Sequence, residues 1–161
     1  DVPFGSLIKE KKDYTINILN IEREGKKPRK DYAMYSEIKD KINYMYDELF
    51  NYDNLELKTS YKKEILKDYI ENYYNNKDNE EIWYEKIKKL SLKYGYAKEV
   101  KEYKQNPENY KGHVGDVCEL IRVSLTSSTK TPDLYQIMNV LGETRVKERM
   151  NKFITYLDEK L

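Results

Sequence analysis

The sequence is poor in several residues that particular protein classes need. One cysteine and one histidine among 161 residues exclude a disulfide framework and a Cys/His zinc site within the chain. The 6 glycines and 4 prolines are too few for a β-sandwich, a barrel or a collagen-like array. No apolar run approaches the ~20 residues of a membrane-spanning helix, and no charged-then-apolar leader opens the chain. We therefore expect a cytoplasmic protein without membrane attachment.

The charge balance gives no sign of a nucleic-acid surface. The 30 basic and 29 acidic residues leave a formal net charge of +1, whereas nucleic-acid-binding domains normally carry a basic surplus. Only five of the basic residues are arginine, namely Arg23, Arg29, Arg122, Arg145 and Arg149. Because lysine cannot supply the planar fork of a guanidinium, each arginine in this lysine-rich chain is a candidate for a specific contact.

Apolar residues recur with the spacing of amphipathic helices through most of the chain. The six periodic stretches are residues 35–49, 61–73, 83–94, 114–125, 134–141 and 146–157. Segment 14–23 fits either a further helix or a short extended piece. The sequence therefore predicts an all-α protein.

Residues typical of helix ends flank these stretches. Thr59-Ser60 precedes the second stretch, and Asp78 with Glu81 forms the expected N-cap pair of the third. Gly95 and Gly142 stand where a helix commonly ends in a left-handed residue. These signals predict where the third and fifth helices stop.

The most polar stretch between strongly periodic segments divides the predicted helices into two groups. Residues 75–79 lack helical spacing, so we place a boundary there, between a first helical lobe at 1–77 and a second at 78–161. Further loops are predicted at 106–109 and 126–132. No repeat of fixed period is found, which disfavours a solenoid.

Residues that usually carry chemistry are scarce. The run from His113 to Asp116 resembles an H-x-G-H nucleotide-binding signature, but Asp116 replaces its second histidine and the surroundings are helical. We interpret His113 as a helix entry, with Gly112 supplying the turn. Cys118 lies on an apolar helical stripe and is expected to be a buried, unreactive thiol. We expect no catalytic, cofactor-binding or metal-ligating residue, so the chain should act by binding.

Three motifs in the last third of the chain form a characteristic series. They are Leu120–Thr126 (LIRVSLT), Thr131–Tyr135 (TPDLY) and Leu141–Val146 (LGETRV). Together they resemble the C-terminal anticodon-binding region of bacterial glutamyl-tRNA synthetases, the class I enzymes also called glutamate–tRNA ligases. The resemblance covers nearly the whole chain. It is strong over residues 103–149 and looser before them. One departure is Ser127, where many members of the family have glycine.

The resemblance implies a fold, a partner and an absent activity. It implies a two-lobed α-helical cage of the class I anticodon-binding type. As a monomer, this cage would position tRNA(Glu) for ATP-dependent glutamylation. The family's adenylation chemistry uses ATP and magnesium in an N-terminal domain with H-x-G-H and K-M-S-K motifs. Neither motif occurs in this sequence, so we expect the chain by itself to be a non-catalytic fragment of a glutamate–tRNA ligase.

The resemblance also implies which residues contact the anticodon. The arginine of the family's L-R-x-A-L-T helix corresponds to Arg122, and the pocket beside it corresponds to Thr131, Pro132 and Leu134. Arg122 could instead form a helix-to-helix salt bridge. The family's first lobe contributes a helix that we equate with residues 36–50. There, Asn43 and Tyr44 beside the apolar stripe are candidates from the residue pattern alone.

Two alternatives stay open at this point. One is the similar α-helical cage of class I lysyl-tRNA synthetases, and the other is a free-standing helical scaffold that binds a protein. A scaffold should bind no tRNA at low salt. Because a near-zero net charge leaves few contacts that neutralise phosphates, we expect tRNA binding in the micromolar range or weaker, falling quickly with salt.

Overall fold

Helices make up almost all the regular structure in this computed structural model, which describes residues 4–21 and 41–160. The α-helices are α1 (Phe4–Glu10), α2 (Lys12–Leu19), α4 (Lys63–Asp68), α5 (Glu80–Lys93), α6 (Val100–Gln105), α7 (Val114–Thr126) and α8 (Leu134–Lys160). Shorter turns are the 3-10 turns η1 (Asn43–Met45) and η3 (Pro107–Asn109) and the π-helical turn η2 (Tyr69–Tyr73). In these ranges the only β-type pairing is an isolated bridge between Ala97 and His113. The prediction of an all-α fold is confirmed.

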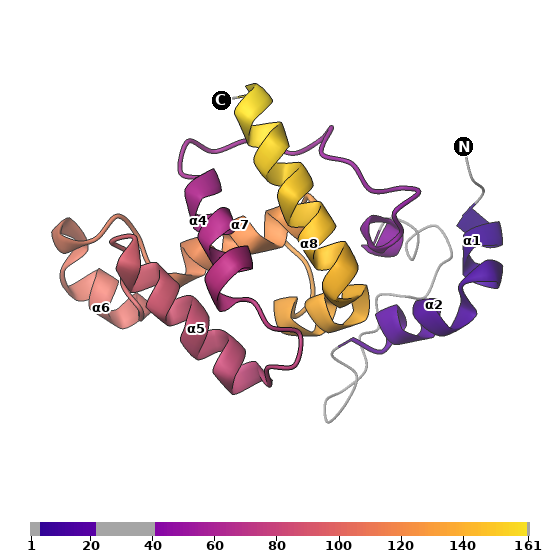
Figure 1. Cartoon of the computed structure of the whole chain (residues 1–161), viewed down its shortest axis with the longest axis horizontal. Coiled ribbons are helices and arrows are strands. Elements are labelled where there is room, and N and C mark those ends of the chain that lie inside the picture. Colours follow the sequence, from indigo (N-terminus) through magenta and orange to yellow (C-terminus); the bar gives the residue numbers. More distant parts are fainter. Residues whose placement is uncertain (1–3, 22–40, 161) are drawn as a thin grey trace.

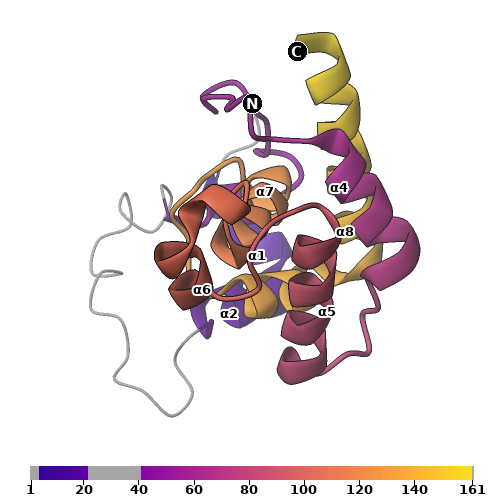
Figure 2. The same ribbon diagram turned by 90° about the vertical axis from the view of Figure 1, so that its left-hand side faces the viewer.

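Helix α8 occupies the middle of the molecule (Figure 1). It packs against α7, α4 and α2, while α5 packs against α7. Helices α1 and α2 lie at one end of the long axis and α6 at the other (Figure 1), so α6 faces the viewer in Figure 2. None of the helices in the described ranges is both long and apolar enough to cross a membrane.

The core is built from the apolar stripes that the sequence predicts. Ile121 and Leu125 of α7 are fully buried, as are Ile137 and Phe153 of α8. The buried cluster runs from α1 to the end of α8 and includes residues on both sides of position 77. The division into lobes at 77/78 stays a prediction.

Local capping residues decide where α5 begins and ends. The N-cap is Asn79, whose Oδ1 accepts a hydrogen bond from the Ile82 amide at 2.9 Å. The prediction of Asp78 as the cap is therefore wrong by one residue, because the Asp78 carboxylate instead accepts a bond from Lys86 Nζ at 2.6 Å. Gly95 follows the helix with φ +86°, as its predicted position requires.

Helix α4 begins later than the sequence signal suggests. Its first residue is Lys63, and the residue before it, Lys62, is extended and makes no side-chain cap. Thr59-Ser60 therefore does not cap this helix. Segment 14–23, which the sequence left open, is helical as far as Leu19, and its residues 22 and 23 lie outside the described ranges.

The predicted helix over residues 36–50 is wrong for its second half. Residues 36–40 lie outside the described ranges, η1 covers only Asn43–Met45, and Tyr46 is extended with φ −99° and ψ 126°. Tertiary contacts override the helical spacing here. The ring of Tyr46 packs edge-on against Tyr14 at 5.6 Å between centroids, and Phe50 packs against Tyr52 at 5.0 Å. A continuous helix would instead place Tyr46 and Phe50, which are four residues apart, on the same side of the helix.

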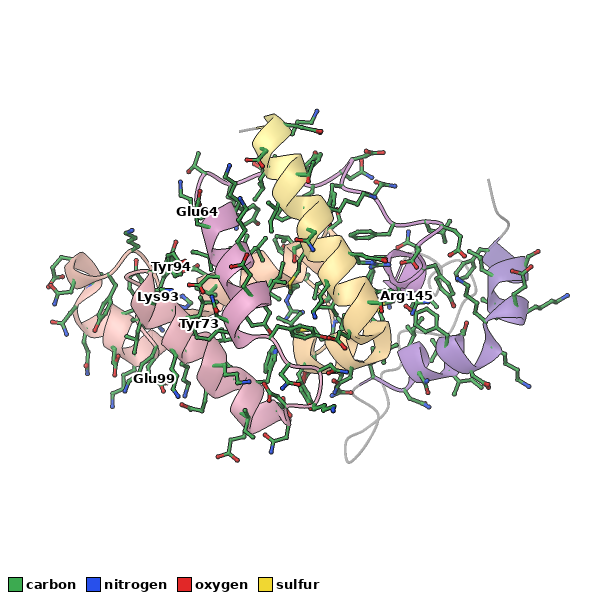
Figure 3. The ribbon with its side chains drawn as sticks, viewed as in Figure 1. Glu64, Tyr73, Lys93, Tyr94, Glu99 and Arg145 are labelled. Atoms are coloured by element: carbon green, nitrogen blue, oxygen red, sulfur yellow. The ribbon has the colours of Figure 1, made fainter. Side chains whose placement is uncertain are left out.

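A buried carboxylate at the end of α4, where the turn η2 begins, bonds to the end of α5. Asp68 is 7% exposed and accepts hydrogen bonds from Lys93 Nζ at 2.5 Å and from the Tyr94 hydroxyl at 2.9 Å. Asn72 adds a third bond at 2.8 Å. Figure 3 shows Lys93 and Tyr94 beside Tyr73, where α5 meets this turn. Burial raises the pKa of Asp68, but the three bonds outweigh it and hold the pKa below its usual range.

This carboxylate should make stability depend on acid pH. A depressed pKa gives stabilisation that is complete above the unfolded value of about 3.9 and is lost as pH falls through the folded pKa. In Asp68→Asn the deficit in unfolding free energy should therefore be largest above about pH 4 and shrink below it. Urea unfolding from pH 2 to 7 measures this. Exposed Asp53→Asn is the control, and an Asp68→Asn deficit independent of pH would contradict the prediction.

Candidate nucleic-acid interface

The loop between α7 and α8 is held in shape by its own side chains. Ser127 ends α7 in the left-handed region at φ 57°, which glycine adopts at less cost than serine. The Thr126 hydroxyl donates to the Arg122 carbonyl at 2.8 Å and accepts from the Ser128 amide at 3.2 Å. Ser128 in turn accepts from the Lys130 amide at 3.1 Å. These bonds within the loop fix its conformation without any contribution from a ligand.

Arg122 clamps the far end of this loop. Its Nη1 donates to the Pro132 carbonyl at 2.7 Å, to the Thr131 carbonyl at 3.3 Å and to the Thr131 hydroxyl. The guanidinium thus bonds to a loop, and the helix-to-helix salt bridge that rivals the base-reading role is not found among the described residues. Only Nη1 is engaged there. Nε and Nη2 make no hydrogen bond in the described part of the chain and can still donate.

One face of the loop borders a cleft of about 660 Å³. This first cleft is lined by Lys41, Asn43, Tyr44, Leu49, Phe50, Asn51, Asn54, Thr126, Ser127, Ser128, Lys130, Thr131 and Pro132. The two earlier candidates from segment 36–50, Asn43 and Tyr44, thus line the same cleft as Thr131 and Pro132. Its described lining includes Lys130 and no carboxylate, so it favours a negatively charged ligand.

The loop's far end borders a second cleft of about 830 Å³. This second cleft is lined by Asn79, Glu80, Glu81, Trp83, Tyr84, Cys118, Arg122, Asp133 and Leu134. The four predicted site residues therefore divide into two pairs, Thr131 and Pro132 in the first cleft and Arg122 and Leu134 in the second. The bonds from Arg122 to residues 131 and 132 join the two clefts.

Sequence reasoning missed several residues of these clefts. Trp83, the single tryptophan of the chain, fits a helical core stripe but is only half-buried and faces the second cleft. Lys130 looks like one more solvated lysine, and Phe50 looks like part of a helix. Only the packing of segment 43–54 against the loop brings Phe50 and Lys130 to the same cleft.

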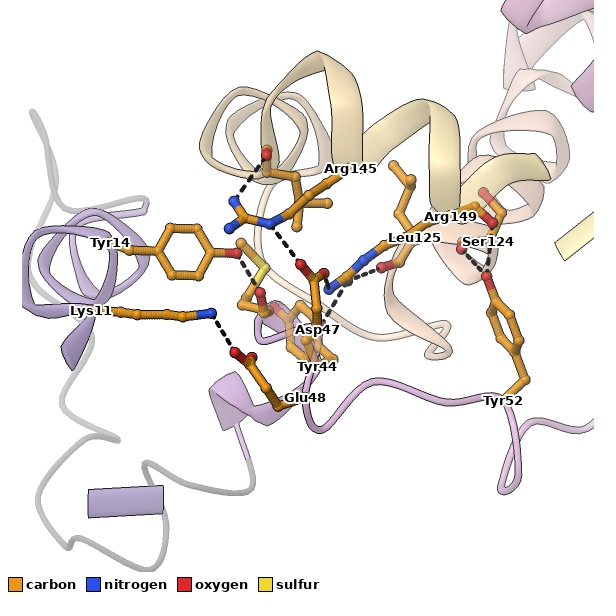
Figure 4. Close-up of polar contacts among 12 residues, drawn as sticks. Lys11, Tyr14, Tyr44, Asp47, Glu48, Tyr52, Ser124, Leu125, Arg145 and Arg149 are labelled. Atoms are coloured by element: carbon orange, nitrogen blue, oxygen red, sulfur yellow. Dashed lines mark hydrogen bonds and ion pairs between the residues drawn. The ribbon is translucent and has the colours of Figure 1, made fainter. Parts of the chain in front are cut away.

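A second arginine, which the sequence marks only as a candidate for some specific contact, lies next to residues of the first cleft without lining it. Figure 4 shows Arg149 of α8 reaching between segment 44–47 and the end of α7. Its Nη2 donates to Asp47 Oδ1 at 3.0 Å, and Arg145 Nε donates to Asp47 Oδ2 at 3.1 Å. Burial raises the pKa of Asp47, but these two arginines outweigh it and hold that pKa below its usual range. Asp47 therefore stays charged at neutral pH and ties its segment to α8.

Comparison with known proteins agrees with this geometry. The family model described as "Anticodon binding domain" matches residues 29–154. The chain belongs to the anticodon-binding domain family. The resemblance to glutamate–tRNA ligases that the three motifs indicate is confirmed by curated relatives across nearly the whole chain.

The relatives are longer than this anticodon-binding domain. A glutamate–tRNA ligase of Clostridium perfringens (strain SM101 / Type A) is 41% identical over 154 residues, which are 92% of this chain and 28% of the relative. The ligase of Clostridium beijerinckii is 37% identical over 161 residues, 96% of this chain and 29% of its own. The ligase of Sorangium cellulosum is 36% identical over 159 residues, which are 96% of this chain and 28% of the relative. No solved structure matches the chain.

The two residues that looked most like chemistry in this anticodon-binding domain have local explanations. His113 Nδ1 accepts from the Gly115 amide at 2.9 Å, and the Asp116 carboxylate accepts from the His113 amide at 2.9 Å. These bonds form a capping box, so His113 is the helix entry that we predicted. Cys118 is half-buried at the second cleft, not fully buried as predicted, but desolvation raises its pKa to about 11, which keeps this thiol protonated at neutral pH.

Within the described ranges, no three His, Cys, Asp or Glu side chains gather as metal ligands would. The carboxylates of the second cleft, on Glu80, Glu81 and Asp133, lie around Trp83 and Arg122. The carboxylates of Glu80 and Glu81 suit hydrogen bonds from amino or imino groups of a ligand.

Proposed function

We propose that this domain binds the anticodon loop of tRNA(Glu) and positions that tRNA for ATP-dependent glutamylation within a longer glutamate–tRNA ligase. Membership of the anticodon-binding family and the relatives' names support the proposal. The observation that carries it is the pair of clefts on either side of one clamped loop, with Arg122, Thr131, Pro132 and Leu134 distributed between them.

The two clefts suit different parts of a single-stranded RNA loop. RNA sequence is read mainly on unstacked bases, which stack on aromatic or guanidinium planes and hydrogen-bond along their edges. In the second cleft Trp83 and Arg122 supply such planes, and Leu134 supplies an apolar contact. In the first cleft Lys130 favours the phosphate backbone, while Thr131 and Pro132 border a base.

The chemistry of aminoacylation lies elsewhere in this proposal. ATP and magnesium act in the parent enzyme's nucleotide-binding domain, whose H-x-G-H and K-M-S-K motifs this sequence lacks. The residues of this chain bind and orient RNA, and none takes part in bond making. We expect the domain to act as a monomer in the cytoplasm.

Arg122→Lys tests the base-reading role. Lysine keeps the charge and one donor for the loop carbonyls but loses the planar fork. A bidentate contact to a base edge is worth ~1–3 kcal/mol in DNA complexes, a scale we apply to RNA. We expect the Kd for a stem-loop RNA carrying the glutamate anticodon to rise about tenfold or more. The Kd for the same stem-loop with a substituted anticodon should change much less.

The control is the thermal unfolding midpoint of the same variant. If Arg122 only holds the loop, Arg122→Lys should lower the unfolding midpoint and raise the Kd for both stem-loops equally. That result would contradict the base-reading role. Failure of the unmodified domain to bind either stem-loop at low salt would instead contradict the proposed function and favour a protein-binding scaffold. Fluorescence anisotropy with labelled RNA gives each Kd.

A further inference from the structure

Arg149 is a buried charge whose three acceptors lie on two other parts of the chain. Its side chain is 4% exposed. Nη1 donates to the Tyr44 carbonyl at 2.7 Å and to the Leu125 carbonyl at 2.8 Å, and Nη2 donates to Asp47 at 3.0 Å. The guanidinium carbon also lies 4.0 Å from the centre of the Phe50 ring. One planar group therefore fixes segment 44–50 against the end of α7 and against α8.

The contacts of Arg149 coincide with the walls of the first cleft. Tyr44 and Phe50 line one wall, and the residues directly after Leu125, Thr126 and Ser127, line the other. The backbone at the Tyr44 and Leu125 carbonyls is held by the same Nη1 atom. The guanidinium is thus the side chain that bonds directly to the backbone of both walls, and the Tyr52 hydroxyl adds a bond to the Ser124 carbonyl at 2.6 Å farther along the segment (Figure 4).

Stability alone does not account for an arginine here. A buried guanidinium loses its hydration, and the Arg149 Nε is buried without a hydrogen-bond partner in the described structure, which adds a further cost. Replacing buried charges by apolar side chains of similar volume is often neutral or stabilising. What an apolar side chain cannot do is hold two carbonyls and a carboxylate in fixed directions.

We propose that Arg149 is a positioning residue for RNA binding, setting the separation of the two walls of the first cleft without itself contacting RNA. This inference rests on the proposed function, because it concerns the cleft that the RNA loop would enter. Its own claim is geometric. Loss of the guanidinium should loosen segment 43–50 and residues 125–128 together and weaken RNA binding in protein that is still folded.

Arg145 provides a matched control one turn earlier on α8. It bonds to the same Asp47 carboxylate at 3.1 Å and lies over the Tyr14 ring at 4.7 Å. Its other bond is to the Leu141 carbonyl at 3.3 Å. None of these partners lines the first cleft, so changing Arg145 disturbs the shared carboxylate and leaves both walls anchored by Arg149.

The test compares Arg149→Met and Arg149→Lys with Arg145→Lys. Each variant's Kd for the glutamate-anticodon stem-loop is measured by anisotropy well below its unfolding midpoint. We expect Arg149→Met to raise the Kd at least tenfold, Arg149→Lys to raise it severalfold, and Arg145→Lys to leave it within about twofold. An unchanged Kd in folded Arg149 variants would overturn the inference, whatever happens to the midpoint. If Arg149→Met does not fold, Arg149→Lys decides by the same criterion.

Hydrogen exchange separates this inference from the proposed function. In Arg149→Lys, amides of 43–50 and of 125–128 should exchange faster, while those of α5 stay as protected as in the unmodified chain. If the unmodified chain binds no RNA while both segments exchange faster in Arg149→Lys, the proposed function fails, but the claim that Arg149 holds the two walls together is supported. If exchange is unchanged in both segments, or rises uniformly over the whole chain, the claim that Arg149 holds the two walls together is refuted.

Discussion

Phe153→Ala should lower the free energy of unfolding by ~3–5 kcal/mol, the usual cost of emptying a fully packed aromatic site. Phe153 is 0% exposed. Its ring lies 5.0 Å from that of Tyr52 and 6.2 Å from that of Tyr156. For a chain of this size each kcal/mol shifts the unfolding midpoint by ~2–4 °C, so thermal unfolding followed by circular dichroism should show a large displacement.

Two further variants calibrate this result. Phe153→Leu keeps much of the volume and should lose clearly less stability than Phe153→Ala. Leu92→Ala removes a side chain that is 48% exposed, so it should change the free energy of unfolding by no more than ~0.5 kcal/mol. A Phe153→Ala loss as small as that of Leu92→Ala would mean that this ring is not part of the core.

Phe153 also connects the core to the first cleft. The Tyr52 hydroxyl, on the ring that packs against Phe153, donates toward the Ser124 carbonyl at 2.6 Å and the Arg149 carbonyl at 3.0 Å. These carbonyls belong to the last turn of α7 and to the residue that holds the cleft walls. We therefore expect hydrogen exchange around residues 124 and 149 to rise in Phe153→Ala.

Gly142→Ala should destabilise the domain by ~1–3 kcal/mol, the cost of a side chain in backbone geometry that is open almost only to glycine. Gly142 has φ 83° and ψ 164° within α8, where it separates two helical runs. A Cβ at this position would meet no atom of any other described part of the chain within 4 Å, so tertiary crowding adds nothing and the cost comes from the local backbone conformation. Urea unfolding measures the loss.

D-alanine at position 142 is the matched control. It adds the same methyl group but prefers positive φ, so semisynthetic protein carrying it should be about as stable as the unmodified chain, or slightly more so. Equal losses with L- and D-alanine would contradict the conformational explanation. An L-alanine variant of undiminished stability would mean that α8 straightens through this position at no cost.

The sequence by itself determines the helical class and much of the local detail. The stripes at 114–125 and 146–157 became α7 and the second run of α8, and Gly95 and Gly142 ended helices where predicted. The entry at His113 was equally legible. These features depend on residues within one or two helical turns of each other, where periodicity and capping act directly. The predicted site residues Arg122 to Leu134 also lie close together in the chain, and the family resemblance pointed to them.

Only the tertiary structure decided how distant segments share a site. The chain leaves helical geometry after Met45 because its aromatic side chains find separate partners, which no local spacing encodes. The sequence marks Arg149 as a candidate for a specific contact but cannot name the contact, because its partner Tyr44 lies 105 residues away in the sequence. The division of Arg122, Thr131, Pro132 and Leu134 between two clefts likewise depends on which segments pack beside the loop. Long-range packing sets these relations, because a side chain's burial depends on every segment that meets it and not on its neighbours along the chain.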